Sequence, residues 1–251
     1  MIEGLKYVIR KGRSYYGIRG NKMYLRDEIR NYKVTTALSP ELIKTSREYK
    51  ALAVLKYSFP ERFSKLQKSE APDLQEPDGE LAVEVTWGGS PRDALISGES
   101  VKYSHAKTKA EKERIRRKIR KNGGDRDDIS TSYPVGTSEG DKKNVIEAFR
   151  KKLKKADNYR QSFLRIGLAI IIDIPLFLID DSDWGNWLSD INNDRFEFVA
   201  LIHWSGVDIY DFKTGEYSKQ RISREDMDAL KRLGRMAAEG KIKDDDPVWE
   251  V

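Results

Sequence analysis

The chain has 251 residues, 35% of them charged, and a formal net charge of +6. This length allows one large or two small domains with a substantial core, and the basic balance suits a nucleic-acid partner without demonstrating one. Cysteine is absent and histidine occurs only at His105 and His203, which excludes disulfides, a thiol nucleophile and a cysteine-based zinc site. The sequence also lacks the glycine-rich loops that hold nucleotide phosphates.

No segment of the sequence suggests a membrane partner. The first residues lack the charged-then-apolar order of a signal peptide. The longest apolar run, 167–179, is too short to span a bilayer and is interrupted by Asp173 and Pro175. We therefore expect a soluble, cytoplasmic protein.

The N-terminal part of the chain, residues 1–38, is predicted to be a β-ribbon. Short apolar stretches between turn residues are typical of strands joined by tight turns. Gly20 and Asn21 favour a hairpin turn between strands within 15–25. The remaining residues, 39–251, are expected to form one α/β domain.

A helix is expected over residues 39–57. Ser39 can cap its N-terminus, Pro40 suits the first helical position and Glu41 complements the helix dipole. Pro60 follows shortly after the expected end of this helix.

Within this helix, Glu48 is a candidate functional acid. It lies on one stripe with Leu52 and Leu55, so it faces partly towards the core. A glutamate at the edge of an amphipathic helix is the commoner explanation of such a position, and the stripe alone does not distinguish the two.

Two extended segments follow, 71–75 and 80–86, and each presents one carboxylate. The turn between them has the Pro-Asp-Gly order that type I and II turns favour. Because strand side chains alternate, Glu84 and Thr86 face the side opposite to the apolar residues of their strand. An acid in such a strand needs a compensating charge, which a divalent metal held between Asp73 and Glu84 would supply.

Residues 88–141 are predicted to be an insertion, helical over about 93–122 and a loop over 122–141. Its helix is strongly basic, and a basic helix beside a loop could bind a phosphate backbone. The cations chosen for that contact are Lys109, Lys112, Arg116, Arg117 and Arg120. A solvated helix with internal ion pairs is the alternative.

A second helix is expected over 142–159, with one apolar face and many basic residues. Lys152 adjoins the apolar face, and Lys155 lies one turn beyond it. A row of surface lysines is also typical of a solvated helix face.

The remaining segments predict more strands and a final helix. The near-continuous apolar run at 163–173 suggests a strand buried on both faces of a sheet. The other expected elements are a short helix or turn at 184–193, a strand at 196–204, a hairpin at 207–212 and 217–222, and a helix at 224–239. Together these elements predict an α/β fold with a mixed central β-sheet flanked by helices.

The Pro72-Asp73 segment, the short turn and the strand carrying Glu84 and Thr86 resemble the core motif of the PD-(D/E)XK, or restriction-endonuclease-like, nuclease superfamily. The resemblance covers about residues 39–212. It implies a restriction-endonuclease-like core, to which the N-terminal β-ribbon and the basic helical insertion are additions.

The resemblance also implies a metal site. Asp73 and Glu84 would bind Mg²⁺ or Mn²⁺, and the helix that precedes the Pro-Asp strand often contributes a third acid, here Glu48. Glu61 and Glu70 are second choices for that acid. Because like charges crowd in such a site, we expect raised carboxyl pKa values when no metal is bound.

The catalytic lysine of the superfamily has no counterpart in the motif, because Thr86 stands at its usual position. Some members supply this lysine from elsewhere in the fold. We therefore expect Lys152, or failing that Lys155, to reach the site, with Lys155 also able to contact nucleic acid.

The implied activity is metal-dependent hydrolysis of phosphodiesters, most directly by a DNA endonuclease in restriction, phage defence or mobile-element biology. RNA is a less favoured substrate. A homodimer is compatible with this activity, since two sites related by a two-fold axis can cut both strands of a duplex. The alternative is a catalytically inactive nucleic-acid-binding or protein-interaction module on the same fold, which Thr86 favours.

Overall fold

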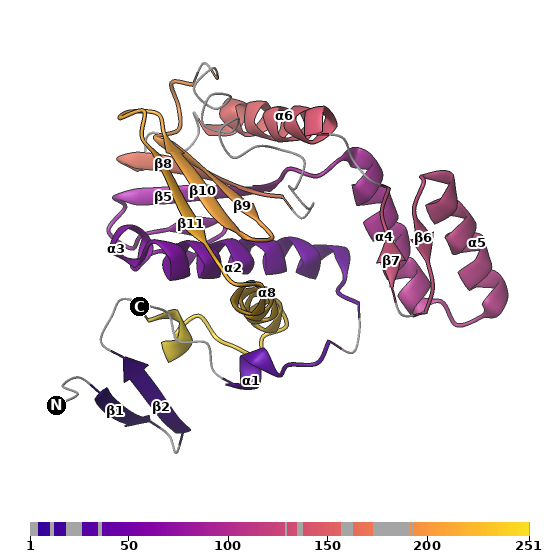
Figure 1. Ribbon diagram of the computed structural model, residues 1–251, viewed down its shortest axis with the longest axis horizontal. Helices are drawn as coiled ribbons and strands as arrows, with labels where there is room; N and C mark the ends of the chain where they lie inside the picture. Colours follow the sequence, from indigo (N-terminus) through magenta and orange to yellow (C-terminus); the bar gives the residue numbers. More distant parts are fainter. Residues whose placement is uncertain are drawn as a thin grey trace.

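The structure is a computed structural model, and it describes most of the chain (Figure 1). The described residues are 5–10, 13–18, 27–34, 37–128, 130–134, 138–156, 163–172, 191 and 193–250.

A seven-stranded mixed sheet forms the centre of the protein, in the order β11-β10-β9-β8-β5-β4-β3. Its strands are β3 (Gln67–Lys68), β4 (Leu74–Gln75), β5 (Leu81–Trp87), β8 (Arg165–Ile171), β9 (Phe198–His203), β10 (Gly206–Asp211) and β11 (Tyr217–Arg221). The neighbours β5, β8 and β9 are parallel, and the remaining pairs are antiparallel. This arrangement confirms the predicted mixed sheet.

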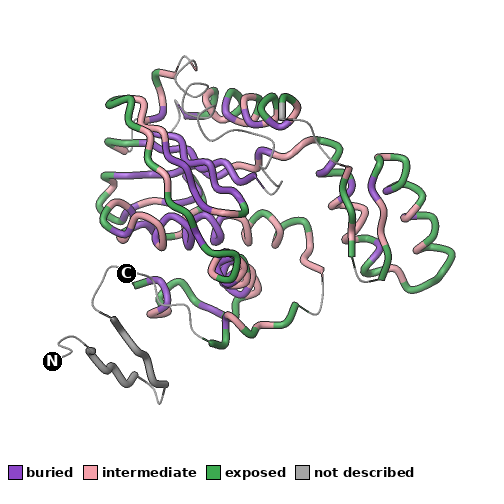
Figure 2. The backbone as a smooth tube through the Cα atoms, in the orientation of Figure 1, coloured by how far each residue is buried: buried purple, intermediate pink, exposed green. Residues whose placement is uncertain are grey.

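Helices cover both faces of the sheet (Figure 1). On one face lie α2 (Pro40–Ser58) and α8 (Arg224–Ala238), and on the other lies α6 (Ser138–Ala156). Val83 and Val85 of β5 belong to the core under α2 and α8, whereas Leu168 and Ile170 of β8 belong to the core under α6. The central strands are therefore buried from both sides, as their apolar sequence predicted (Figure 2).

Local sequence signals mark the N-termini of α2 and α8 as expected. The Ser39 hydroxyl accepts a hydrogen bond from the Leu42 amide at 3.4 Å, and Pro40 is the first residue of α2. Likewise, the Ser223 hydroxyl accepts from the Asp226 amide at 3.0 Å and caps α8. The final helix, the β10–β11 hairpin and the strands β8 and β9 confirm the corresponding predictions.

The turn between β4 and β5 is confirmed as well. The Gly79 amide donates to the Glu76 carbonyl at 3.0 Å, and Gly79 has a φ of +74°. Glycine adopts this left-handed conformation without the steric cost that a side chain would bring. The turn directs β5 back along β4 and so brings Asp73, which directly precedes β4, beside Glu84 of β5.

The basic insertion has its own small core and protrudes from the end of the sheet (Figures 1 and 2). It contains α4 (Pro91–His105), α5 (Lys109–Lys121) and a short hairpin of β6 (Asp125–Arg126) and β7 (Thr131–Ser132). Its buried residues are Ile96, Tyr103, Ile115 and Ile119.

Two predictions for this region need correction. The helical segment is two helices, because the chain turns at Ala106 and Thr108 caps α5 by accepting from the Glu111 amide at 3.2 Å. The expected loop over 122–141 contains the β6–β7 hairpin and the first residues of α6.

The described N-terminal residues form a two-stranded β-ribbon, as predicted for this part of the chain. Strand β1 (Leu5–Arg10) pairs with β2 (Arg13–Ile18), so the turn follows Arg10. The predicted turn at Gly20 and Asn21 lies outside the described residues, as do residues 184–190 of the expected short helix or turn.

Three short helices complete the described chain: α1 (Asp27–Arg30), α3 (Pro60–Phe63) and the 3₁₀ helix η1 (Pro247–Trp249). Arg30 of α1 joins α8 through an ion pair with Asp226 at 2.8 Å. Within the described part of the chain, none of the helices combines the length and apolar character needed to cross a membrane.

Candidate metal centre

Three buried carboxylates come together where α2 meets the β4–β5 pair. Glu48 lies on α2, Asp73 directly precedes β4, and Glu84 lies in the middle of β5; each is 4% exposed. The pairing of Leu74 with Val83 places Asp73 beside Glu84. The structure therefore gathers the three acids that the sequence predicted, from three separate elements.

The backbone of β5 holds one of these acids directly. The Val85 amide donates a hydrogen bond to Asp73 Oδ2 at 2.8 Å. Because β4 begins only at Leu74, the Val85 amide is free to bind the Asp73 side chain in place of a strand partner. This contact fixes the carboxylate against the sheet.

Three lysines surround the carboxylates. Lys44 Nζ lies 3.2 Å from Glu48 Oε1 and 3.9 Å from Asp73 Oδ1. Lys68 Nζ lies 3.0 Å from Glu48 Oε2, and Lys152 of α6 forms an ion pair with Glu84 Oε1. Three ammonium groups thus balance three carboxylates, which offsets the cost of burying those charges.

Two side chains of the centre, Asp73 and Lys44, have a raised pKa. Burial, together with the neighbouring Glu84 and Glu48 carboxylates, raises the pKa of Asp73 from 3.8 to about 6, against the lowering effect of the Val85 amide. The prediction of raised carboxyl pKa values is thereby confirmed for Asp73. The Glu48 carboxylate, aided by Asp73 and Glu84, raises the pKa of Lys44.

The raised pKa of Asp73 predicts how the stability of the protein without metal depends on pH. Below about pH 3 the carboxyl is protonated in both the folded and the unfolded state. As pH rises from about 3 to about 6 the unfolded chain loses this proton first, so the free energy of unfolding falls. Asp73→Asn removes this loss and should exceed the wild type in stability by an amount that grows from near zero at about pH 3 to about 3 kcal/mol at about pH 7. Urea denaturation in EDTA at several pH values measures the difference, and a pH-independent difference would contradict it.

The structure places the other predicted residues as follows. Thr86 is half-buried on the same side of β5 as Glu84, opposite Ile170. Lys155 is exposed, and no ion pair among the described residues includes it. Glu61 and Glu70 are exposed and are not part of the cluster.

Sequence reasoning missed two of the lysines. Lys44 could have been found, because it precedes Glu48 by one helical turn, the spacing of a common helix ion pair. Lys68 had no such signal: it reaches Glu48 because β3 pairs with β4 at the edge of the sheet.

A second acidic group lies on the β4–β5 turn. The carboxylate oxygens of Glu76, Asp78 and Glu80 lie within 4.8 Å of one another, whereas those of Glu48, Asp73 and Glu84 do not all meet that distance. Asp78 and Glu80 are exposed, and Asp78 pairs with Lys65 at 3.0 Å. Exposed acids on a turn are common without any ion, so the candidate centre is the buried set of Glu48, Asp73 and Glu84. A metal ion bound by this buried set would displace the lysines that pair with it.

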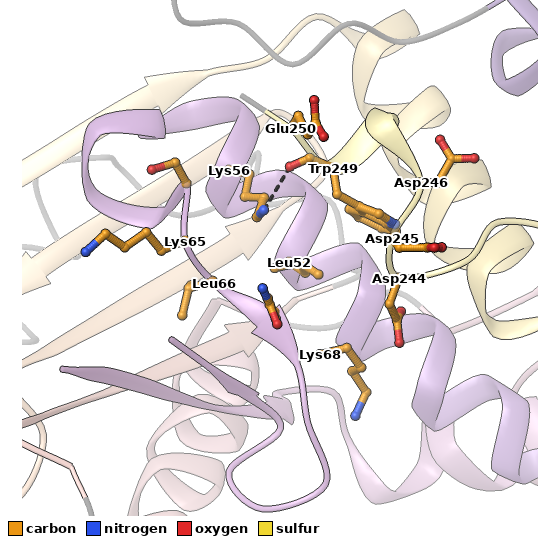
Figure 3. Close-up of a pocket in the computed structure, with 12 residues that line it drawn as sticks. Leu52, Lys56, Lys65, Leu66, Lys68, Asp244, Asp245, Asp246, Trp249 and Glu250 are labelled. Carbon is orange, nitrogen blue, oxygen red and sulfur yellow. Dashed lines mark hydrogen bonds between the residues drawn. The ribbon is translucent and has the colours of Figure 1, made fainter. Parts of the chain in front are cut away.

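A cavity of about 270 Å³ lies beside the centre, between α2, β3 and the C-terminal segment (Figure 3). Lys56 points towards η1 and donates a hydrogen bond to the Trp249 carbonyl at 2.8 Å. Lys68 lines the cavity and also pairs with Glu48, so it links the two. The acidic tail residues Asp244, Asp245 and Asp246 form part of the opposite wall.

The described fold is of the α/β class, with a seven-stranded mixed sheet between helices. Comparisons with protein-family models, with curated proteins and with solved structures find no match to the chain.

Proposed function

We propose that the protein is a metal-dependent nuclease that hydrolyses phosphodiester bonds in DNA, built on a restriction-endonuclease-like core. One observation carries this proposal: Glu48, Asp73, Glu84 and Lys152, chosen from the sequence as a nuclease site, converge from four elements into one cluster.

The order of elements supports the same proposal. Helix α2 carries the third acid, Asp73 precedes β4, Glu84 lies on β5, and α6 with Lys152 leads into β8 parallel to β5. A helix, two strands with the acids, a second helix and a further strand is the order that the resemblance implies.

The donor set fits a hard divalent cation. Mg²⁺ and Mn²⁺ prefer carboxylate oxygens, and Glu48, Asp73 and Glu84 offer them from a buried position. When bound, such an ion lowers the pKa of a water and acts as a Lewis acid on the phosphate. Lys44 is largely exposed, so its side chain is free to turn away from Glu48 and Asp73, whereas Lys68 and Lys152 are largely buried and would have to shift away from Glu48 and Glu84 to admit the ion.

Lys152 can supply the positive charge that Thr86, at the usual position of the catalytic lysine, lacks. It reaches Glu84 from α6, on the side of β5 where Thr86 also points. Its ammonium is a compact positive charge that can contact a phosphate oxygen and stabilise the negative charge that develops there.

The alternative is a catalytically inactive nucleic-acid-binding or protein-interaction module. Its supporting observation is that Lys44, Lys68 and Lys152 already form ion pairs with all three carboxylates. A closed ion-pair network of this kind can hold α2 and α6 against the sheet without any metal.

The test is a cleavage assay on plasmid, linear duplex, single-stranded DNA and RNA, with Mg²⁺ or Mn²⁺ and with EDTA. The proposal requires metal-dependent cleavage of DNA that is lost in Asp73→Asn and kept in a control variant, Glu147→Gln, which changes an exposed acid of α6. Cleavage of RNA alone would correct the substrate. No cleavage by the folded protein, together with no Mn²⁺ binding in calorimetry, would favour the inactive module.

A further inference from the structure

The positive charge of the protein is concentrated in the basic insertion. Residues 91–134 hold twelve lysine and arginine residues and seven aspartate and glutamate residues, a net charge of +5 against +6 for the whole chain. The rest of the protein is therefore close to neutral. The insertion is thus strongly attractive to a polyanion, as is α6, whose residues 138–156 hold seven lysine and arginine residues against three aspartate and glutamate residues.

The acids of the insertion neutralise one side of α5. Lys112 pairs with Asp128 at 2.6 Å, and Arg116 and Arg120 pair with Asp125 at 3.3 and 3.1 Å. These three cations were among those predicted to contact nucleic acid, but they hold α5 against the β6–β7 hairpin and its loop.

The opposite side of α5 keeps its charge. Arg114, Arg117 and Lys121 are exposed, and none has an ion-pair partner among the residues that the structure describes. Their spacing of three and four residues places them on one stripe, which faces away from the buried Ile115 and Ile119. We call these three residues the α5 stripe.

We propose that the α5 stripe binds the phosphate backbone of duplex DNA and so holds the substrate of the proposed nuclease, on whose activity this inference rests. The stripe rises about 10 Å along the helix axis, at roughly 1.5 Å per residue. One DNA strand presents a charge about every 3.4 Å of axis, so three phosphates match three cations in number. Two of the cations are arginines, whose planar guanidinium binds phosphate oxygens in pairs.

The composition of this surface favours DNA over an acidic protein. Protein interfaces have an apolar core within a polar rim. On α5 the apolar isoleucines are buried, and the exposed side offers only Ala110 beside the charged residues. The insertion also protrudes beyond the sheet, which leaves the stripe accessible to a long, rigid polymer (Figure 1).

The experiment compares DNA binding of the wild type with that of a triple variant, Arg114→Ala, Arg117→Ala and Lys121→Ala. Fluorescence anisotropy with a labelled DNA duplex is recorded in EDTA over a range of salt concentrations, so that no cleavage contributes. Losing three phosphate contacts should weaken binding at least about tenfold at low salt and reduce the salt dependence, as the slope of log K against log salt, by about 2 to 3.

The matched control removes the same charge elsewhere, through Lys213→Ala, Arg224→Ala and Lys243→Ala. These residues are exposed, lie outside the insertion and form no ion pair among the described residues. Near-wild-type binding by the control and weak binding by the stripe variant, both with wild-type thermal unfolding, support the proposal. Equal losses in both variants, or full binding by the stripe variant, overturn it.

Two further arms separate this inference from the proposed function. Stronger stripe-dependent binding to duplex RNA or single strands than to duplex DNA overturns the assignment to duplex DNA. If Asp73→Asn keeps its DNA affinity in EDTA while the stripe variant loses it, the proposal that the α5 stripe binds DNA stands, whether or not the carboxylates are catalytic. If the stripe variant binds DNA normally but cleavage still needs metal and Asp73, the proposed role of the α5 stripe is wrong and the proposed nuclease activity stands.

Discussion

Glu84→Ala should abolish metal binding and cleavage together, whereas Lys152→Ala should remove most of the cleavage and leave metal binding in place. Glu84 offers the cation an oxygen, and Lys152 offers none, only a positive charge near Glu84. Removing one preorganised positive group from a reacting centre typically lowers the rate by about 10²–10³-fold. Calorimetry with Mn²⁺ and single-turnover cleavage measure the two effects separately.

Matched controls lie next to Lys152 on the same helix. Lys151 carries the same charge as Lys152, and Glu147 the same charge as Glu84, but both are exposed. Lys151→Ala and Glu147→Ala should therefore change neither Mn²⁺ binding nor cleavage. A Lys152→Ala variant that loses metal binding as completely as Glu84→Ala would show that the lysine supports the fold of the centre instead of acting on the substrate.

The Glu84–Lys152 pair also predicts a stability effect that needs no assay of activity. Both side chains are nearly buried, at 6% and 14% exposed. Removing one partner of a buried pair typically costs about 3–5 kcal/mol, because the other charge is left unpaired. The double variant should therefore be more stable than either single variant, and additive losses in urea denaturation would contradict this coupling.

Gly234→Ala should destabilise the protein, whereas the same change at Gly98 should stabilise it. A Cβ at Gly234 of α8 would lie 2.7 Å from the Lys50 amide nitrogen and 2.8 Å from the Ser46 carbonyl oxygen of α2. Both are backbone atoms, so the helices must separate, and overpacking of this kind costs about 1–3 kcal/mol. A Cβ at Gly98 of α4 would meet nothing within 4 Å, and alanine in a helix is favoured by roughly 0.5–1 kcal/mol over glycine.

Thermal unfolding measures both effects, at roughly 2–4 °C of Tm per kcal/mol for a chain of this size. Since α2 carries Glu48, a displaced α2 should also weaken Mn²⁺ binding in Gly234→Ala, and Gly98→Ala should leave that binding unchanged. Equal shifts of Tm in the two variants would show that α8 does not pack on α2 as described.

Much of the main sheet and its helices could be predicted because their signals are local. Ser39 and Ser223 cap helices, Gly79 allows the turn before β5, and the apolar run of β8 predicts a strand buried on both faces. The errors came where competing local signals were nearly equal. The helical pattern over 93–122 continues across the helix cap at Thr108, so the break between α4 and α5 was not predicted.

The candidate centre likewise combines features that the local sequence determines with contacts that only the fold determines. The sequence by itself determined that Asp73 and Glu84 lie on neighbouring extended segments, because a short turn joins those segments. It also determined that Glu48 faces partly towards the core, because helix periodicity places it on one stripe with Leu52 and Leu55. Only the tertiary structure decided that Lys152 reaches Glu84, that Lys68 reaches Glu48, and that Asp125 and Asp128 neutralise one side of α5. Those contacts join residues on separate elements, and helix periodicity limits which face a side chain occupies without specifying what the fold places opposite it.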